Sequence, residues 1–276
     1  MRNTAKLTTA VLAAGALTLG LGACGSSGSD SASDTSGPLV VAASPTPHAE
    51  ILNYIKENLA KKAGLDLEVK EFSDYTTQNP ATEDGSVDAN YFQNQPYLDD
   101  YNKKNGTHIV PVVTVHLEPL GLYSHKVKSA DALNSGATVA VPNDSVNEAR
   151  ALELLAAHGL ITLKDGAGSE ATPSDITKNP KNLKFKELEA PQTPRSLDDV
   201  DAAVVNGNYA IEADLKPATD ALVLESAKDN PYGNFLAVKD GNEDDPRVKK
   251  LAKLLTSAEV KKFIEDKYAG SVLASF

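Results

Sequence analysis

The sequence contains little cysteine and little positive charge. It has one cysteine and no tryptophan in 276 residues, and 27 lysine and arginine residues against 38 aspartate and glutamate residues. A single cysteine excludes a disulfide framework, a CxxC redox pair and a cysteine-based zinc site. The net charge of −11 argues against general nucleic-acid binding, which needs a basic face for the phosphates. The apolar fraction of 41% is ordinary for a soluble globular protein, and the length suggests about two domains.

The sequence also lacks the common signatures of catalysis. It contains no G-x-S-x-G elbow, P-loop or H-E-x-x-H motif. Residues 166–171 match G-x-G-x-x-A, but they lie in a polar stretch without the preceding strand and following helix of a dinucleotide site. The five histidines show no metal-ligand spacing. We therefore predict a protein that is not an enzyme, with no catalytic residues, no cofactor and no resident metal.

The cysteine follows a stretch typical of a secretion signal. Residues 1–23 begin with basic residues and continue with an apolar run, which is shorter than the ~20 residues of a membrane span. The sequence Leu-Gly-Ala-Cys at 21–24 resembles the bacterial lipobox, whose cysteine is diacylated and becomes the first residue of the mature protein. The Gly/Ser/Asp-rich stretch that follows is typical of a flexible tether. We predict a signal peptide at 1–23 and a lipidated Cys24 with its tether at 24–37, anchored at the outer face of the cell membrane.

Two stretches of the remaining chain share one order of strand, helix and strand, which apolar periodicity indicates in both. The first unit comprises residues 39–43, 51–59 and 65–69, and the second comprises residues 137–141, 146–158 and 184–188. A Val-Asp-Ala triplet comes after each unit, at 87–89 after the first and at 200–202 after the second. The repeat predicts two lobes of similar architecture.

Extended stretches at 109–123 and 235–238 join these units, and two helices end the chain. We predict an α/β, two-lobed fold like that of periplasmic binding proteins, in which each lobe is a mixed, mainly parallel sheet flanked by helices. Lobe I is predicted at 38–116 plus 235–276, and lobe II at 117–234. Because α/β folds bind ligands at the carboxyl ends of strands, a ligand cleft is expected between the lobes.

Several polar residues fall where such a cleft would lie. Asn147 and Arg150 are three residues apart in the first turns of the second helix, where free N–H groups and the helix dipole attract anions. A guanidinium there can clamp a carboxylate with two parallel hydrogen bonds. Asn206 and Asn208 follow the second triplet, and Asn234 lies at the second crossing between lobes.

Six motifs in order resemble the NlpA-type family of methionine-binding lipoproteins of ABC importers. They are FQNQPYLDDY, HLEPLGLYS, VAVPNDSVNEARALELL, NPKNL, LEAPQTPRSLDDVDAAVVNGNYA and NPYGNFLAV. The similarity runs from about Leu39 to the last residue. It implies a two-lobed, monomeric binding protein that closes on free methionine, D or L, and delivers it to a membrane permease. Through that permease its further partner would be an ATPase.

The resemblance also implies which residues bind the ligand. The predicted ligand-binding residues are Tyr75, Phe92, Asn94, Tyr97, His116, Glu118, Asn147, Arg150, Asn206 and Asn234. The three aromatic residues would line a thioether pocket, Arg150 and Asn147 would meet the ligand carboxylate, and the asparagines at 206 and 234 would bind the polar head.

Glu118 of the HLEP motif and Asn94 of the FQNQPY motif bear on which ligand is bound. Glu118 would pair with the ligand ammonium, whereas many family members have a histidine where this chain has Asn94. The alternative ligands are a methionine-containing dipeptide or another apolar amino acid, which would differ in the cleft volume that they need.

Overall fold

The computed structural model describes residues 37–276, which belong to one compact unit, Asp34–Phe276. The predicted signal peptide, Cys24 and almost all of the tether lie outside the described residues. In the part of the chain that the structure describes, no helix is long and apolar enough to cross a membrane.

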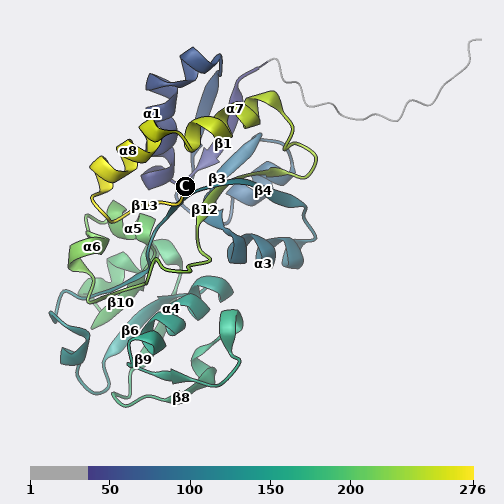
Figure 1. Cartoon of the computed structure of the whole chain (residues 1–276). Helices are drawn as coiled ribbons and strands as arrows, with labels where there is room; N and C mark the ends of the chain where they lie inside the picture. The colour runs from purple at the N-terminus through teal and green to yellow at the C-terminus, as the bar shows by residue number, and fades with distance from the viewer. Residues whose placement is uncertain (1–36) are drawn as a thin grey trace, which may run out of the picture. The chain divides into compact units, whose positions relative to one another are not determined.

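The first lobe is a six-stranded sheet in the order β13-β4-β12-β3-β1-β2, covered by helices (Figure 1). Its strands are β1 (Leu39–Ala43), β2 (Leu67–Glu71), β3 (Ala89–Asn94), β4 (Ile109–Leu117), β12 (Asn234–Lys239) and β13 (Leu273–Ala274). Its helices are α1 (Glu50–Asn58), α2 (Gln78–Glu83), α3 (Gln95–Asn105), α7 (Pro246–Leu255) and α8 (Ala258–Tyr268). Leu236 of β12 joins the core formed with α1, α7 and α8, while the neighbouring Phe235 packs with Leu98 of α3. Successive side chains of the strand therefore serve cores on opposite faces.

The second lobe is a five-stranded sheet in the order β11-β5-β10-β6-β9. Its strands are β5 (Gly121–Tyr123), β6 (Thr138–Pro142), β9 (Lys184–Leu188), β10 (Ala202–Val205) and β11 (Val223–Leu224), and β7 (Thr162–Leu163) pairs separately with β8 (Ile176–Lys178). Its helices are α4 (Ser145–Ala157), α5 (Gly207–Glu212) and α6 (Pro217–Asp220). Leu152 of α4 packs in one core with Val139, and Tyr209 of α5 packs in another with Ala203.

The repeat predicted from the sequence is present in the topology. Strands β3-β1-β2 of the first sheet correspond to β10-β6-β9 of the second, and both triplets are parallel. The repeated aspartates have the same role, because the Asp88 carboxylate accepts from the Val40 N–H at 2.7 Å and the Asp201 carboxylate accepts from the Thr138 N–H at 2.8 Å. Each of the six predicted strands and helices of the two units lies within two residues of an observed one.

Both sheets are mixed, as predicted, but the prediction that they are mainly parallel is wrong. Among residues 37–276, parallel pairs join β2, β1 and β3 in one sheet and β9, β6 and β10 in the other. The other pairs in these two sheets are antiparallel. The reason is that β12 returns from the second lobe and inserts between β3 and β4, and β5 runs against β10.

The chain passes between the lobes twice. It leaves the first sheet at the end of β4 and enters the second at β5, so residues 118–120 form one crossing. It returns between β11 and β12, through residues 225–233. Glu118 lies in the first crossing, and Glu225 and Tyr232 lie in the second.

Candidate ligand-binding site

A cavity lies between the two sheets, and residues of both lobes line it. The lining residues are Tyr75, Phe92, Gln93, Asn94, Tyr97, Glu118, Asn147, Arg150, Asn206, Gly207, Asn208 and Asn234. They enclose about 360 Å³ of empty space, the opening to solvent included.

The structure brings nine of the ten predicted site residues together around this cavity. The exception is His116, which is fully buried and lies behind Glu118 instead of lining the cavity. The predicted ligand-binding residues do not include Gln93, Gly207 and Asn208, which also line the cavity. The sequence places Asn208 near the cleft from its position after the second Val-Asp-Ala triplet, but does not assign it to the ligand. Gly207 is needed for close approach, because a Cβ there would lie 2.6 Å from the Glu118 Cβ.

The first lobe contributes an aromatic wall. The ring of Tyr75 lies 6.0 Å from that of Phe92 and 5.9 Å from that of Tyr97, measured between centroids. The Tyr97 hydroxyl donates to the Tyr75 backbone oxygen at 3.2 Å, which fixes two of the rings relative to each other. Asn94 ends β3 and caps α3, because its side chain accepts from the Tyr97 N–H at 3.2 Å. Asn94 thus also helps to place the aromatic ring of Tyr97.

The second lobe contributes a relay of amides with fixed direction. Asp144 is the N-cap of α4, and both of its carboxylate oxygens accept from the Asn147 side-chain amide at 3.0 Å. A carboxylate only accepts, so Asn147 presents its oxygen to Asn206, whose amide nitrogen donates to it at 2.8 Å. The Oδ1 atom of Asn206 is then the free end of the relay. It is buried and has no hydrogen-bond partner among the described residues, so it can accept from a ligand.

Arg150 is buried on the same side of the cavity, and its guanidinium is held from three directions. Its Nε donates to Glu225 Oε1 at 2.8 Å, and its Nη2 donates to Glu225 Oε2 at 2.5 Å and to the Glu118 backbone oxygen at 3.1 Å. The guanidinium carbon lies 4.0 Å from the centre of the Tyr232 ring. Burial lowers the pKa of Arg150, but the hydrogen bonds and charge of Glu225 more than offset that effect, so the pKa is raised.

The arginine therefore has its two parallel bonds already. The sequence predicted such a fork toward a ligand carboxylate, whereas here it engages Glu225. None of the hydrogen bonds found within residues 37–276 uses Nη1 of Arg150. This N–H group, on a side chain that lines the cavity, remains for a ligand.

Tyr75 and Asn208 connect the two walls. The Tyr75 hydroxyl donates to Asn208 Oδ1 at 2.5 Å across the lobes. The amide nitrogen of Asn208 is buried without a partner in the described part of the chain. It is a second free donor at the cavity.

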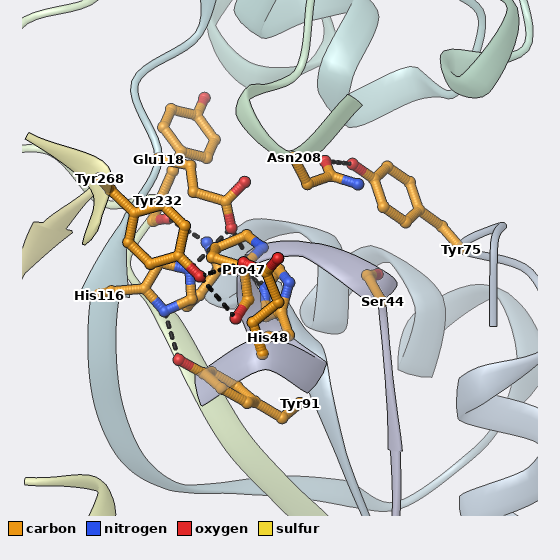
Figure 2. A network of polar contacts seen from close by, with 12 residues as sticks. Ser44, Pro47, His48, Tyr75, Tyr91, His116, Glu118, Asn208, Tyr232 and Tyr268 are labelled. Atoms are coloured by element: carbon orange, nitrogen blue, oxygen red, sulfur yellow. Dashed lines mark hydrogen bonds and ion pairs between the residues drawn. The ribbon is translucent and has the colours of Figure 1, made fainter. Parts of the chain in front are cut away.

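Glu118 meets two histidines, His116 two residues before it and His48, which is distant in the sequence (Figure 2). Its Oε1 lies 2.7 Å from Nε2 of His116 and 3.3 Å from Nε2 of His48. Two histidines and a glutamate are residue types that bind zinc, and their potential ligand atoms lie within 4.8 Å of one another. Because both Nε2 atoms lie at hydrogen-bonding or near hydrogen-bonding distance from the same oxygen, we describe the group as a hydrogen-bonded network and assign no metal to it.

Burial determines the charges in this network. It lowers the pKa of His48 to about 4 and that of His116 to about 3, so both imidazoles are neutral at pH 7. Burial also raises the pKa of Glu118, while the nearby His48 and Arg150 act in the opposite direction. The Glu118 carboxyl group therefore has neutral imidazoles on one side and the cavity on the other.

Comparisons with known proteins show which family the chain is similar to. The family model described as NlpA lipoprotein matches residues 39–276. The methionine-binding lipoprotein MetQ of Bacillus subtilis is 44% identical over 257 residues, which cover 92% of this chain and 93% of the relative. The D-methionine-binding lipoprotein MetQ of Escherichia coli is 46% identical over 209 residues, 75% of this chain and 77% of the relative.

A solved structure is equally similar. The nutrient binding protein from Burkholderia cenocepacia bound to methionine has a TM-score of 0.84 and 47% identity. The match covers 86% of this chain and 100% of the Burkholderia chain. The predicted two-lobed α/β fold is confirmed by this likeness. With a family match from residue 39 to the last residue and relatives above 40% identity over most of its length, this chain belongs to the NlpA lipoprotein family.

Proposed function

We propose that this protein is a substrate-binding lipoprotein, not an enzyme, that captures methionine outside the cytoplasm for an ABC importer. The observation that carries the proposal is the pairing of free donors and free acceptors in one buried cavity beside an aromatic wall. The names of the similar proteins from Bacillus subtilis and Escherichia coli, and the methionine-bound neighbour, support the same ligand.

The free polar atoms match a zwitterion. Arg150 Nη1 supplies donors for a ligand carboxylate, together with the second N–H of the Asn234 amide, whose other N–H faces the Tyr232 backbone oxygen at 3.5 Å. The second oxygen of Glu118 and the free Oδ1 of Asn206 supply acceptors for an ammonium. Asn147 acts mainly by directing Asn206, because its own amide is engaged on both ends. Burying a charged ligand group is strongly disfavoured unless it has such a partner, and this cavity offers partners for both charges of an amino acid. A neutral compound would leave these buried polar groups unpaired, so a free amino acid fits better.

The aromatic wall suits the side chain of methionine. A thioether is polarizable and gains ~0.3–1.5 kcal/mol per favourable contact with an aromatic ring. Tyr75, Phe92 and Tyr97 surround one side of the cavity with such rings. Glutamate would bring a second negative charge to this wall, and Arg150, the one cation among the lining residues, is already engaged by Glu225 and assigned to the ligand carboxylate.

The alternative ligand is a dipeptide that contains methionine or another apolar amino acid. A dipeptide needs a larger cleft than a single amino acid, and binding measurements distinguish the two. Titration calorimetry decides the matter with D- and L-methionine, leucine, norleucine, glutamate and glycyl-methionine. We expect methionine to bind more tightly than leucine or norleucine and far more tightly than glutamate. Glutamate binding as tightly as methionine would refute the proposal, and glycyl-methionine binding more tightly would establish the alternative.

We further propose that Cys24 carries the lipid anchor at the outer face of the membrane, and that the monomer delivers its ligand to a permease coupled to an ATPase. The lipobox sequence at 21–24 and the family's description as lipoproteins support this. A fatty-acid probe should label the native chain in cells and leave a Cys24→Ser variant unlabelled. Equal labelling of the two would reject the anchor.

A further inference from the structure

Three buried side chains lie behind Glu118 and do not line the cavity. Tyr91 comes from β3, His116 from β4, and His48 from the turn Pro45–Ala49 before α1. Each is at most 1% exposed. Their rings pack edge to face, with His48 4.8 Å from Tyr91 and 4.8 Å from His116 between centroids. Three elements of the first lobe therefore meet at one carboxylate of the crossing.

The proton on His116 is fixed by Tyr91. Burial raises the pKa of Tyr91 well above its ordinary value, so the phenol keeps its proton. Its hydroxyl is hydrogen-bonded to Nδ1 of His116 and is the donor, because Nε2 faces the acceptor Glu118 Oε1 and so holds the single proton of the neutral ring. Nε2 of His116 then carries the ring proton and donates it to Glu118 Oε1 at 2.7 Å.

The proton on His48 is fixed by its two neighbours. Its Nε2 faces Asn234 Oδ1 at 3.0 Å and Glu118 Oε1 at 3.3 Å, and both of these atoms are acceptors. Nε2 of His48 is therefore an N–H group as well. The other nitrogen of His48 is buried without a partner in the described residues, which also agrees with a neutral ring.

The His116 proton thus points at one oxygen of Glu118, Oε1, while the His48 N–H is hydrogen-bonded to Asn234 Oδ1 and lies 3.3 Å from the same Glu118 oxygen. Figure 2 shows this oxygen directed at the histidines and the second oxygen directed away from them. A Cβ built on Gly207, a residue that lines the cavity, would lie 3.2 Å from that second oxygen, Oε2. The imidazoles are neutral, so they orient the Glu118 carboxyl group without adding a positive charge beside it. A lysine or arginine in the same place would orient it and neutralise it.

We propose that His48 and His116 are positioning residues for amine recognition, with Tyr91 setting the ring proton of His116. They hold Glu118 so that Oε2 faces the ligand, which makes a free α-amino group a requirement for tight binding. The inference rests on the proposed function, because it concerns how that same cavity selects an amino acid.

The test compares two ligands on the purified full-length lipoprotein in detergent. The ligands are methionine and 4-(methylsulfanyl)butanoate, which is methionine without its amino group. In a His116→Leu variant we expect methionine affinity to fall by about 10- to 100-fold, the range for a lost hydrogen bond to a charged group, while the affinity for the deaminated compound changes by less than about threefold. His116→Gln keeps a donor near the same place and should recover most of the methionine affinity. His125→Leu, at a half-exposed histidine outside the cavity, is the matched control and should leave both affinities unchanged.

A role of His116 in general stability predicts a different pattern. An equal loss for both ligands in His116→Leu, or no loss for methionine, would overturn the inference. If that variant does not fold, Tyr91→Phe decides, since it removes one hydroxyl and should lower the ratio of the two affinities about two- to tenfold. An unchanged ratio in Tyr91→Phe would then overturn the inference. A wild-type protein that does not bind methionine would instead overturn the proposed function.

Discussion

The two walls of the cavity use different physical means. The wall from the first lobe consists of aromatic rings that contact one another, and it recognises shape and polarizability. The wall from the second lobe consists of polar atoms whose hydrogen-bond directions are set by partly buried partners such as Asp144 and Glu225. An apolar pocket distinguishes ligands that differ by one methylene only ~10- to 200-fold, whereas a lost polar partner is rejected far more strongly. The polar wall should therefore decide which class of compound binds, and the aromatic wall which member of the class.

The largest effect is expected at Arg150. Removing one partner of a buried ion pair typically costs ~3–5 kcal/mol, so Arg150→Ala should weaken methionine binding by roughly two to three and a half decades. Calorimetry measures this loss. Because Glu225 is then left without its partner, the ligand-free melting temperature should also fall.

Two variants sharpen this prediction. Arg150→Lys should recover only part of the affinity, because an ammonium cannot make the two parallel bonds to Glu225. Arg195→Ala, at an exposed arginine of the same lobe, should leave binding unchanged. Methionine binding by Arg150→Ala within about threefold of the parent would show that the arginine is not part of the site.

A smaller loss is expected at Glu118. Glu118→Gln keeps the shape of the side chain but removes its charge and replaces one acceptor oxygen by an N–H donor. Methionine affinity should therefore fall by about 10- to 100-fold. The affinity for 4-(methylsulfanyl)butanoate should stay the same or rise. Glu57→Gln, at an exposed glutamate of α1, is the matched control. An equal loss for the two ligands would mean that Glu118 does not recognise the amine.

Acid should weaken binding through the same carboxylate. Since burial raises the pKa of Glu118, the ligand-free protein takes up a proton there as the pH falls, and the protonated form cannot pair with an ammonium. His48 and His116, with pKa values lowered to about 4 and 3, stay neutral over this range, and Arg150 stays charged. Methionine affinity should thus fall by up to about tenfold per pH unit below the Glu118 pKa. Calorimetry in two buffers of different ionisation enthalpy should detect proton release on binding, and proton uptake would contradict the assignment.

The aromatic wall should give still smaller effects. Phe92→Leu removes ring contacts with a thioether, which corresponds to a loss of roughly two- to tenfold for methionine. Norleucine has no sulfur and should lose less, so the ratio of methionine to norleucine affinity should fall. A loss as large as that of Arg150→Ala would contradict the division of labour between the walls.

The smallest effect concerns α4 outside the cavity. Burial and the neighbouring Glu187 raise the pKa of Glu148 to about 7, so the folded state disfavours the charged form. The contribution of this group to stability is therefore lost as the pH rises from the ordinary glutamate range through 7. Glu148→Gln should raise the melting temperature at pH 8 and have little effect at pH 4.5, with methionine affinity unchanged. A melting temperature that rises equally at both pH values would contradict the repulsion.

Local sequence patterns predicted the repeated units well, because each strand and helix there is specified by its own apolar periodicity. The pairing of β12 between β3 and β4 could not be predicted in that way. It joins residues more than a hundred positions apart, and Phe235 pairs with both Gln93 and Thr114.

The same limit applies to the site. Residues in the motifs after strands were predictable, as with Asn147 and Asn206. His48 lies in a short turn 68 residues before His116, and Glu225 lies 75 residues after Arg150. No local spacing marks such partners, so only the fold brings them to the cavity.

The most direct test of the account is one titration series on the purified lipoprotein. Methionine is compared with 4-(methylsulfanyl)butanoate, which lacks the amino group, and with 3-(methylsulfanyl)propylamine, which lacks the carboxylate. Because each charge of the zwitterion has its own partner in the polar wall, both truncated compounds should bind at least about 100-fold more weakly than methionine. Binding of either compound within about threefold of methionine would contradict the claim that the cavity recognises a zwitterionic amino acid.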